Sequence, residues 1–256
     1  MPQPSRYVWY DHMTRDTDAA AAFYTKVVGW GTQAWDGPAP YTMFTVDNAP
    51  IGGLMGIPAE ASGAPPHWIG YVGVADVDAA AREVKQLGGT VHHEPTDIPE
   101  VGRFAIVADP QGAAFALFTP APTAQPTYAG PPRNGDMSWH ELVTTDREAA
   151  WSFYQGLFGW EKGDAMDMGP AGVYQMFNIN GVPAGGMMNK TPDMPMPPSW
   201  LYYATVPEIN AAAERVKGAG GQVINGPMEV PGGGWILQGM DPQGGMFALY
   251  QMPAQA

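Results

Sequence analysis

Cysteine is absent from the 256-residue chain. The sequence therefore cannot build a disulfide framework, a zinc–thiolate site or a thiol nucleophile. Basic residues are scarce as well, with 12 Lys and Arg against 25 Asp and Glu and a formal net charge of -13. Because such an acidic surface repels phosphate groups and anionic lipid, we expect neither nucleic acid nor a membrane surface as a partner.

Long apolar runs are also missing. No segment approaches the ~18 apolar residues that a membrane-spanning helix needs, and residues 1–13 contain no basic region followed by an apolar run. We therefore expect a cytoplasmic protein. The sequence contains neither a Walker phosphate loop nor a Gly-x-Ser-x-Gly elbow, so phosphate-loop and serine-nucleophile chemistry have no support.

What the chain does contain is a repeat. Residues 9–30 match residues 139–160 at an offset of 130, sharing Trp, Thr, Asp, Ala-Ala, Phe-Tyr and Gly-Trp. The Asp-Pro-Gln-Gly sequence at Asp109 recurs at Asp241. A proline- and glycine-rich stretch separates the halves, which favours a linker. We predict a first module at residues 1–120, a linker at 121–136 and a second module at 137–256.

Each half is in turn built from repeats of about sixty residues. The pattern Asp-x-Asp-Ala-Ala-Ala begins at Asp16 and again at Asp76. Each copy follows an alternating, strand-like segment and ends near glycine, as a helix with an acidic N-cap and a glycine C-cap does. Short β-rich segments follow, so each repeat predicts a βαβββ unit. Two such half-buried units should pair into one curved, mostly antiparallel eight-stranded sheet with helices on its convex side, an α+β fold.

These motifs carry a family resemblance. The order Asp-x-x-x-Ala-x-x-Phe-Tyr-x-x-x-x-Gly-Trp, with Asp-Pro-x-Gly before the last strand, resembles the vicinal oxygen chelate superfamily of glyoxalases, bleomycin-resistance proteins and extradiol dioxygenases. The resemblance covers residues 7–119 and 137–252. It implies two tandem glyoxalase-like modules, each with a concave pocket, in a fold that serves metal-dependent enzymes and non-catalytic drug binders alike.

The resemblance also implies where a catalytic metal would be held, on His or Glu residues of the first strands and a Glu of the last strand. Side chains that cannot bind a divalent cation occupy these positions here: Trp9, Trp139, Ile69, Leu201, Ala116 and Ala248. A further position falls in Ile51–Met55 and Val182–Met187, which hold only glycine and apolar residues. We therefore predict no metal and no other cofactor.

Alternation along the strands predicts which side chains share the ligand-binding face. The predicted lining residues are Trp9, Asp11, Met13, His67 and Tyr71 in the first module and Trp139, Glu141, Ser199 and Tyr203 in the second. Asp11 with His67 offers at most two ligands to one divalent metal ion, which is the alternative cofactor. Asp11 and Glu141 are the candidate catalytic residues.

The other histidines have structural interpretations. His12 and His140 fall on the side of their strands that faces the helices, so we expect them in or near the core. His92 and His93 are adjacent and point to opposite faces of one strand, so they cannot chelate a metal together, and a solvated edge is favoured.

The favoured function is binding of a small aromatic or amphipathic molecule without the usual family metal, in the manner of a bleomycin-resistance protein. An acidic lining would favour a cationic ligand. The alternative is a lyase, isomerase or dioxygenase in which Asp11 or Glu141 acts as a base, with or without a displaced divalent metal. A third hypothesis is an interaction protein with vestigial cavities. Because both modules lie on one chain, either a monomer or a homodimer is compatible with the sequence.

Overall fold

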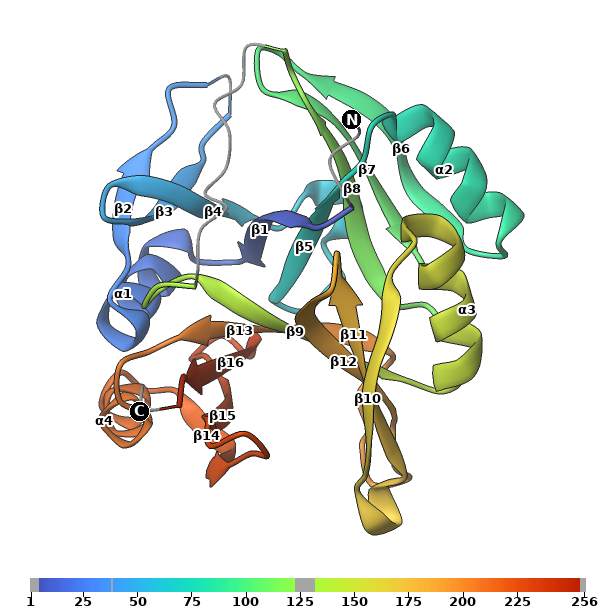
Figure 1. The fold of residues 1–256 in the computed structure, drawn as a ribbon. Coiled ribbons are helices and arrows are strands. Elements are labelled where there is room, and N and C mark those ends of the chain that lie inside the picture. Colours follow the sequence, from blue (N-terminus) through green and yellow to red (C-terminus); the bar gives the residue numbers. More distant parts are fainter. Residues whose placement is uncertain (1–4, 38, 123–131, 254–256) are drawn as a thin grey trace. The chain divides into compact units, whose positions relative to one another are not determined.

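The computed structural model describes residues 5–37, 39–122 and 132–253, and residues 123–131 of the predicted linker lie outside this range. The elements follow one another in four βαβββ repeats (Figure 1). The first two repeats contain β1 (Tyr7–Thr14), α1 (Thr17–Val28), β2 (Gly31–Ala34), β3 (Thr42–Val46) and β4 (Ala49–Gly56), then a short 3-10 helix (Ala59–Ala61), β5 (His67–Gly73), α2 (Val77–Gln86), β6 (Thr90–Ile98), β7 (Gly102–Ala108) and β8 (Ala114–Pro120).

The last two repeats follow the same order. They contain β9 (Met137–Thr144), α3 (Arg147–Phe158), β10 (Glu161–Asp167), a 3-10 helix (Gly169–Ala171), β11 (Val173–Ile179) and β12 (Val182–Asn189), then β13 (Ser199–Thr205), α4 (Ile209–Gly218), β14 (Gln222–Glu229), β15 (Trp235–Met240) and β16 (Met246–Gln251).

The strands form two eight-stranded sheets, ordered β2-β3-β4-β1-β5-β8-β7-β6 and β10-β11-β12-β9-β13-β16-β15-β14. In the first sheet β1 pairs parallel with β4, and β5 pairs parallel with β8, whereas the hairpins β2-β3-β4 and β6-β7-β8 are antiparallel. The sheets are therefore mixed, and the predicted α+β fold of two eight-stranded sheets built from paired βαβββ units is confirmed. The predicted module boundaries stay a prediction.

Acidic N-caps begin all the α-helices of the described chain. In α1 the carboxylate of Asp16 accepts a hydrogen bond of 2.9 Å from the backbone N–H of Ala19, and Asp76, Asp146 and Glu208 cap the other helices in the same way. The helix ends where Gly29 adopts a left-handed conformation, with a φ of 95°. None of the helices within the described residues is long and apolar enough to cross a membrane.

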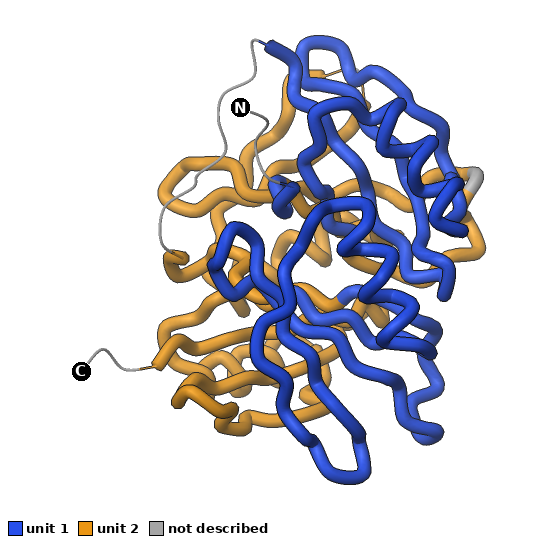
Figure 2. Tube along the Cα trace, turned by 45° about the vertical axis from the view of Figure 1, so that its right-hand side comes forward, with its two compact units in different colours: residues 1–8, 69–128, 140–200 blue, residues 9–68, 129–139, 201–256 orange. Residues whose placement is uncertain are grey.

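Packing groups the repeats in an order that differs from their order along the chain (Figure 2). Residues 9–68, 129–139 and 201–256 form one compact unit, and residues 1–8, 69–128 and 140–200 form the other. We call the first of these the outer-repeat unit and the second the inner-repeat unit. Each unit therefore joins a repeat from the first half of the sequence to a repeat from the second half.

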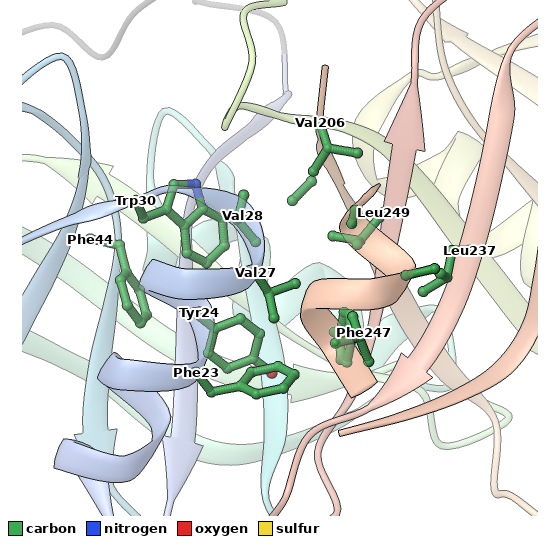
Figure 3. Packing of buried hydrophobic residues seen from close by; sticks show 14 of the residues in the cluster. Phe23, Tyr24, Val27, Val28, Trp30, Phe44, Val206, Leu237, Phe247 and Leu249 are labelled. Atoms are coloured by element: carbon green, nitrogen blue, oxygen red, sulfur yellow. The ribbon is translucent and has the colours of Figure 1, made fainter. Parts of the chain in front are cut away.

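The core of the outer-repeat unit shows why these repeats join. Phe23 and Val27 of α1 point toward Phe247 and Leu249 of β16 (Figure 3), and the rings of Phe23 and Phe247 lie 5.5 Å apart. The apolar face of α1 is thus buried against residues that follow it by more than 200 positions. Arg215 of α4 also links the two repeats, because it donates a hydrogen bond of 3.0 Å to the carbonyl oxygen of Val27.

A buried polar network lies beside this core. Tyr24 of α1 donates a hydrogen bond of 3.0 Å to Asp241 Oδ2 and accepts one of 3.0 Å from Trp68 Nε1. Asp241 Oδ1 accepts the backbone N–H groups of Gln243 and Gly245, so the Asp-Pro-Gln-Gly turn is held from within. The Asp-Pro-Gln-Gly turn at this aspartate thus also links distant repeats.

The inner-repeat unit contains the equivalent network. Tyr154 of α3 donates a hydrogen bond of 3.1 Å to Asp109 Oδ2 and accepts one of 2.8 Å from Trp200 Nε1. The two networks differ at one position. His12 is fully buried in the outer-repeat unit with its Nε2 atom 3.1 Å from Asp241 Oδ2, whereas Leu142 occupies the equivalent position of β9. The core location predicted for His12 is confirmed.

Cutting the chain between its halves tests this interleaved packing. Fragments 1–122 and 132–256 should each fail to unfold cooperatively as a monomer, because each would expose the apolar helix faces that the other fragment covers. Mixing the two fragments should restore a stable one-to-one complex. The measurement is thermal unfolding by circular dichroism together with sedimentation equilibrium. Cooperative unfolding of either fragment alone as a monomer would contradict the grouping.

Candidate functional site

The first candidate site lies on the face of β1 that points away from the helices. His12 of β1 contacts Tyr24 of α1, with ring centroids 5.1 Å apart, so the strand's alternation turns Trp9, Asp11 and Met13 to the opposite face. Asp11 is only 4% exposed. A buried carboxylate needs compensating hydrogen bonds, and the surrounding residues supply them.

Tyr41, which directly precedes β3, meets Asp11 on this face. Its hydroxyl donates a hydrogen bond of 2.5 Å to Asp11 Oδ1. Trp9 Nε1 lies 3.0 Å from the same oxygen and 2.7 Å from the Tyr41 hydroxyl. Burial and the negative charge of Asp11 raise the pKa of Tyr41 far above its ordinary value. Tyr41 therefore stays protonated and acts as a donor toward the carboxylate.

A glycine makes this approach possible. Gly53 of β4 lies opposite Asp11 in the β1–β4 pair and opposite Met43 in the β3–β4 pair. A Cβ atom at Gly53 would lie 1.7 Å from the Tyr41 hydroxyl oxygen and 2.7 Å from Asp11 Oδ1. Both distances are shorter than any van der Waals contact, so only glycine leaves room for the tyrosine to reach the carboxylate.

The inner-repeat unit repeats the arrangement. Glu141 of β9 is 8% exposed and accepts a hydrogen bond of 3.2 Å from the Tyr174 hydroxyl. Gly186 of β12 lies opposite Glu141 and opposite Met176, and a Cβ atom there would lie 2.4 Å from the Tyr174 hydroxyl oxygen. Carboxylate, glycine and tyrosine thus occur in the same relation in both units.

The sequence analysis missed both tyrosines. A signal was present, because Tyr-x-Met-Phe begins at Tyr41 and again at Tyr174, and each copy is followed by a glycine pair. The motif gave no indication of a partner, because each carboxylate lies two strands away in the sheet. The tyrosine and the carboxylate are far apart along the chain and close only in the folded structure. We call the two arrangements, Asp11 with Tyr41 and Glu141 with Tyr174, the carboxylate–tyrosine pairs.

The remaining predicted lining residues lie on three strands, β5, β9 and β13. In the outer-repeat unit, His67 is half-buried with Nδ1 2.8 Å from the Pro65 carbonyl oxygen. Tyr203 accepts a hydrogen bond of 2.7 Å from Gln238 Nε2, and Trp139 packs against the cluster of Leu201, Tyr203 and Ala248. In the inner-repeat unit, Tyr71 lies against two phenylalanines, and Ser199 is a half-buried residue at the start of β13.

The residues that the family resemblance places at the metal positions do not fit a divalent cation. Trp9, Ile69 and Ala116 offer no atom that binds a divalent cation, and neither do Leu201 and Ala248 in the second module. Over residues 5–37, 39–122 and 132–253, no three His, Asp or Glu side chains form a group that could hold a metal ion. Among the described residues, no third His, Asp or Glu side chain joins Asp11 and His67 as a metal ligand. The alternative metal site on this pair stays a hypothesis.

His140 lies on the face of β9 opposite to that of Glu141. Its ring stacks on Tyr7 with centroids 4.0 Å apart, and its Nδ1 lies 2.7 Å from the Ala184 carbonyl oxygen. Burial lowers the pKa of His140 to about 4, although the hydrogen bond to Ala184 acts in the opposite direction. His140 is therefore a neutral core residue at neutral pH, and its predicted near-core location is confirmed.

Known proteins resemble this chain along its whole length. Residues 6–117 and 137–249 match the model of the Glyoxalase/Bleomycin resistance protein/Dioxygenase superfamily. The chain belongs to this family, as the sequence motifs predicted. It is 33% identical over 267 residues to the "Putative glyoxylase CFP32" of Mycobacterium tuberculosis (strain CDC 1551 / Oshkosh), covering 100% of both chains.

Two further proteins are similar to this chain. The "Anthracycline biosynthesis protein DauV" of Streptomyces sp. (strain C5) is 29% identical over 264 residues, covering 97% of this chain and 94% of the relative. The Mn(II)-bound glyoxalase from Novosphingobium aromaticivorans has the same fold, with a TM-score of 0.68 at 17% identity, covering 99% of this chain and 84% of that one.

The role of the glycines can be tested by adding one methyl group. Gly53→Ala should displace Tyr41 from Asp11 and lower the free energy of unfolding by about 1–3 kcal/mol, because overpacking adds to the loss of a buried hydrogen bond. Urea unfolding measures the change. Gly56→Ala, on the same strand with open space around its Cβ position, is the matched control. Equal stability of the two variants would contradict the proposed role of Gly53.

His140 should make the protein sensitive to acid. Its folded-state pKa of about 4 lies below the ~6.5 of an unfolded chain, so the unfolded state binds more protons between these values. The free energy of unfolding should fall by roughly 3 kcal/mol as the pH decreases through this window and stay unaffected by His140 above it.

Urea unfolding at several pH values measures this loss in the natural chain and in His140→Tyr, which introduces the residue found at the equivalent position of β1. The variant should lose the His140 part of the pH dependence. The surface variant His92→Gln should keep it, and an unchanged slope in His140→Tyr would contradict the assignment.

Proposed function

We propose that the chain binds a small aromatic or amphipathic molecule that carries a positive charge, and that the carboxylate–tyrosine pairs are its anchors. The observation that carries this proposal is the recurrence of the pair. Asp11 and Glu141 are buried carboxylates, and each accepts a hydrogen bond from a tyrosine hydroxyl. In both cases the tyrosine occupies space that a glycine leaves open. A feature needed only for folding would not require a buried charge, because an apolar pair stabilises a sheet at lower cost.

The hydrogen bonds around Asp11 favour an anionic anchor. Trp9 Nε1 and the Tyr41 hydroxyl both donate to Oδ1, and hydrogen bonds to a carboxylate stabilise its ionised form. Because Asp11 is removed from water, its attraction for a cation is stronger than that of a surface carboxylate. The indole of Trp9, which is half-buried beside it, adds a ring face for stacking or for a cation–π contact.

Relatives support the choice of an aromatic ligand. A protein named for anthracycline biosynthesis is similar to this chain along nearly its full length, and the anthracycline ring system contains fused aromatic rings. The residues at the family's metal positions lack donor atoms, which favours binding without that metal. Small-molecule binding by a bleomycin-resistance-like protein is therefore the function that we favour.

The second candidate function is catalysis. A relative named as a putative glyoxylase and a fold shared with a Mn(II)-bound glyoxalase favour a lyase, isomerase or dioxygenase. Asp11 or Glu141 would act as the base, alone or with a displaced divalent metal ion on Asp11 and His67. Turnover that survives treatment with a chelator would indicate the metal-free base, and turnover restored by added divalent metal would indicate the displaced metal.

A pair of probes with the same shape and different charge tests the binding proposal. N-Methylacridinium carries a permanent positive charge, whereas acridine is neutral above neutral pH. The natural chain should bind the cation more tightly than acridine. Asp11→Asn combined with Glu141→Gln should weaken binding of the cation about tenfold, equivalent to ~1.4 kcal/mol, and leave acridine binding nearly unchanged. Isothermal titration calorimetry gives both affinities.

Asp18→Asn combined with Glu83→Gln is the matched control, because it also removes two negative charges, both from exposed positions of α1 and α2. It should bind both probes like the natural chain. If the double variant binds the cation as tightly as the natural chain does, the carboxylates have no part in binding.

A further inference from the structure

The strands β5–β8 and β13–β16 turn equivalent but chemically different surfaces away from the helices. Arg103 and the fully buried Ala105 and Val107 mark the helix side of β7, since Arg103 binds Asp78 of α2. Phe104 and Ile106 alternate with them and face the other way. We define the first platform as Tyr71, His93, Phe104, Ile106 and Phe118, and the second platform as Tyr203, Asn225, Ile236, Gln238 and Tyr250.

Strand register shows that the platforms correspond position by position. His93 lies opposite Ile106 in β6–β7, and Asn225 lies opposite Gln238 in β14–β15. In each of these two strand pairs the register shifts immediately before the paired residue, His93 in β6 and Asn225 in β14. Phe104 lies opposite Phe118 on β8, as Ile236 lies opposite Tyr250 on β16. The backbone is thus the same, and only the side chains distinguish the two surfaces.

The first platform consists mainly of aromatic rings, and its polar side-chain atoms are the ring nitrogens of His93 and the hydroxyl group of Tyr71. The His93 ring stacks on Phe104 with centroids 5.1 Å apart and planes within 14°. The ring centroid of Tyr71 lies 6.5 Å from that of Phe104 and 6.4 Å from that of Phe118, and the Tyr71 and Phe118 rings meet edge to face. His93 is exposed, while Phe104, Ile106 and Phe118 are half-buried. Ring faces and edges with these spacings favour contact with another planar aromatic ring.

The second platform carries a chain of hydrogen bonds in place of stacked rings. Asn225 Nδ2 donates a hydrogen bond of 3.2 Å to Gln238 Oε1. Gln238 Nε2 in turn donates one of 2.7 Å to the hydroxyl of Tyr203, which is almost fully buried. The chain runs from this buried hydroxyl to Asn225 at the exposed end, whose amide carbonyl is an acceptor for an approaching donor.

We propose that the two platforms select different ligands. The first binds an unsubstituted aromatic ring by stacking, and the second binds an aromatic ring whose hydroxyl group donates a hydrogen bond to Asn225. Gln238 and Asn225 determine this specificity, since Ile106 and His93 replace them on the first platform. The inference rests on the proposed function, because it presumes that the chain binds small aromatic molecules. Binding sites that hydrogen-bond a hydroxyl discriminate against analogues that lack it, whereas apolar surfaces discriminate weakly.

Reciprocal exchange of the two positions tests the proposal. The probes are naphthalene and 2-naphthol, which differ by one hydroxyl group, and tryptophan fluorescence or calorimetry gives their affinities for the full chain. Asn225→His with Gln238→Ile should reduce the preference for 2-naphthol over naphthalene about tenfold. His93→Asn with Ile106→Gln should raise that preference by a similar factor, because it places the amide pair on the first platform.

His92→Asn, a change on the neighbouring exposed residue of β6, is the matched control and should leave both affinities unchanged. Thermal unfolding confirms that each variant is folded before its affinities are compared. A preference that stays the same in both exchange variants overturns the specificity assignment and leaves the proposed function intact. If the natural chain binds neither naphthalene nor 2-naphthol nor the acridinium probe, the proposed function fails and this inference fails with it.

Discussion

The hydrogen bond between a helix tyrosine and the aspartate of an Asp-Pro-Gln-Gly turn is the interaction on which the packing of each compact unit depends. Tyr24 binds Asp241, and Tyr154 binds Asp109. Each carboxylate also accepts backbone N–H groups of its own turn, so the turn, the helix and a tryptophan are held together. Removing the tyrosine would take one buried hydrogen-bond partner from both the carboxylate and the tryptophan N–H group, which costs more than the hydrogen bond itself contributes.

This shared network has diverged at one position, and the change alters its electrostatics. Burial raises the pKa of Asp109, and Leu142 occupies the position of β9 that is equivalent to His12. Burial would do the same to Asp241, but the hydrogen bond and charge of His12 and the backbone N–H groups of Gly245 and Gln243 lower its pKa below the ordinary value. The outer-repeat unit therefore favours the ionised aspartate in a core that is otherwise equivalent to that of the inner-repeat unit.

Divergence is also uneven on the faces that point away from the helices. The carboxylate–tyrosine pairs have been kept in both units, because glycine at residues 53 and 186 preserves the space that they need. The platforms have changed instead, from stacked aromatic rings to a chain of amides and a hydroxyl group. If the carboxylates anchor a ligand as we propose, a common charged anchor combined with different platforms would let one duplicated fold bind ligands that share a charge and differ in their ring substituents.

Local signals in the sequence determined the elements of this fold. Acidic caps, alanine-rich helices and closing glycines act within a few residues, so the βαβββ repeats, the tandem modules and the family were predictable from the chain alone. Strand alternation has a period of two, so it also placed Trp9, Asp11 and Met13 on one face. The same rule assigned His12 to the side that contacts α1.

Only the tertiary structure decided which repeats pack together and which residues meet Asp11 and Glu141. The repeats share one apolar pattern, so nothing in α1 specifies whether Phe23 packs against its own half of the sequence or against Phe247. Tyr41 meets Asp11 because the register of three strands brings them together and because Gly53 has no side chain in the space that Tyr41 occupies. Pairing of this kind depends on contacts between distant segments, and a pattern confined to neighbouring residues does not contain it.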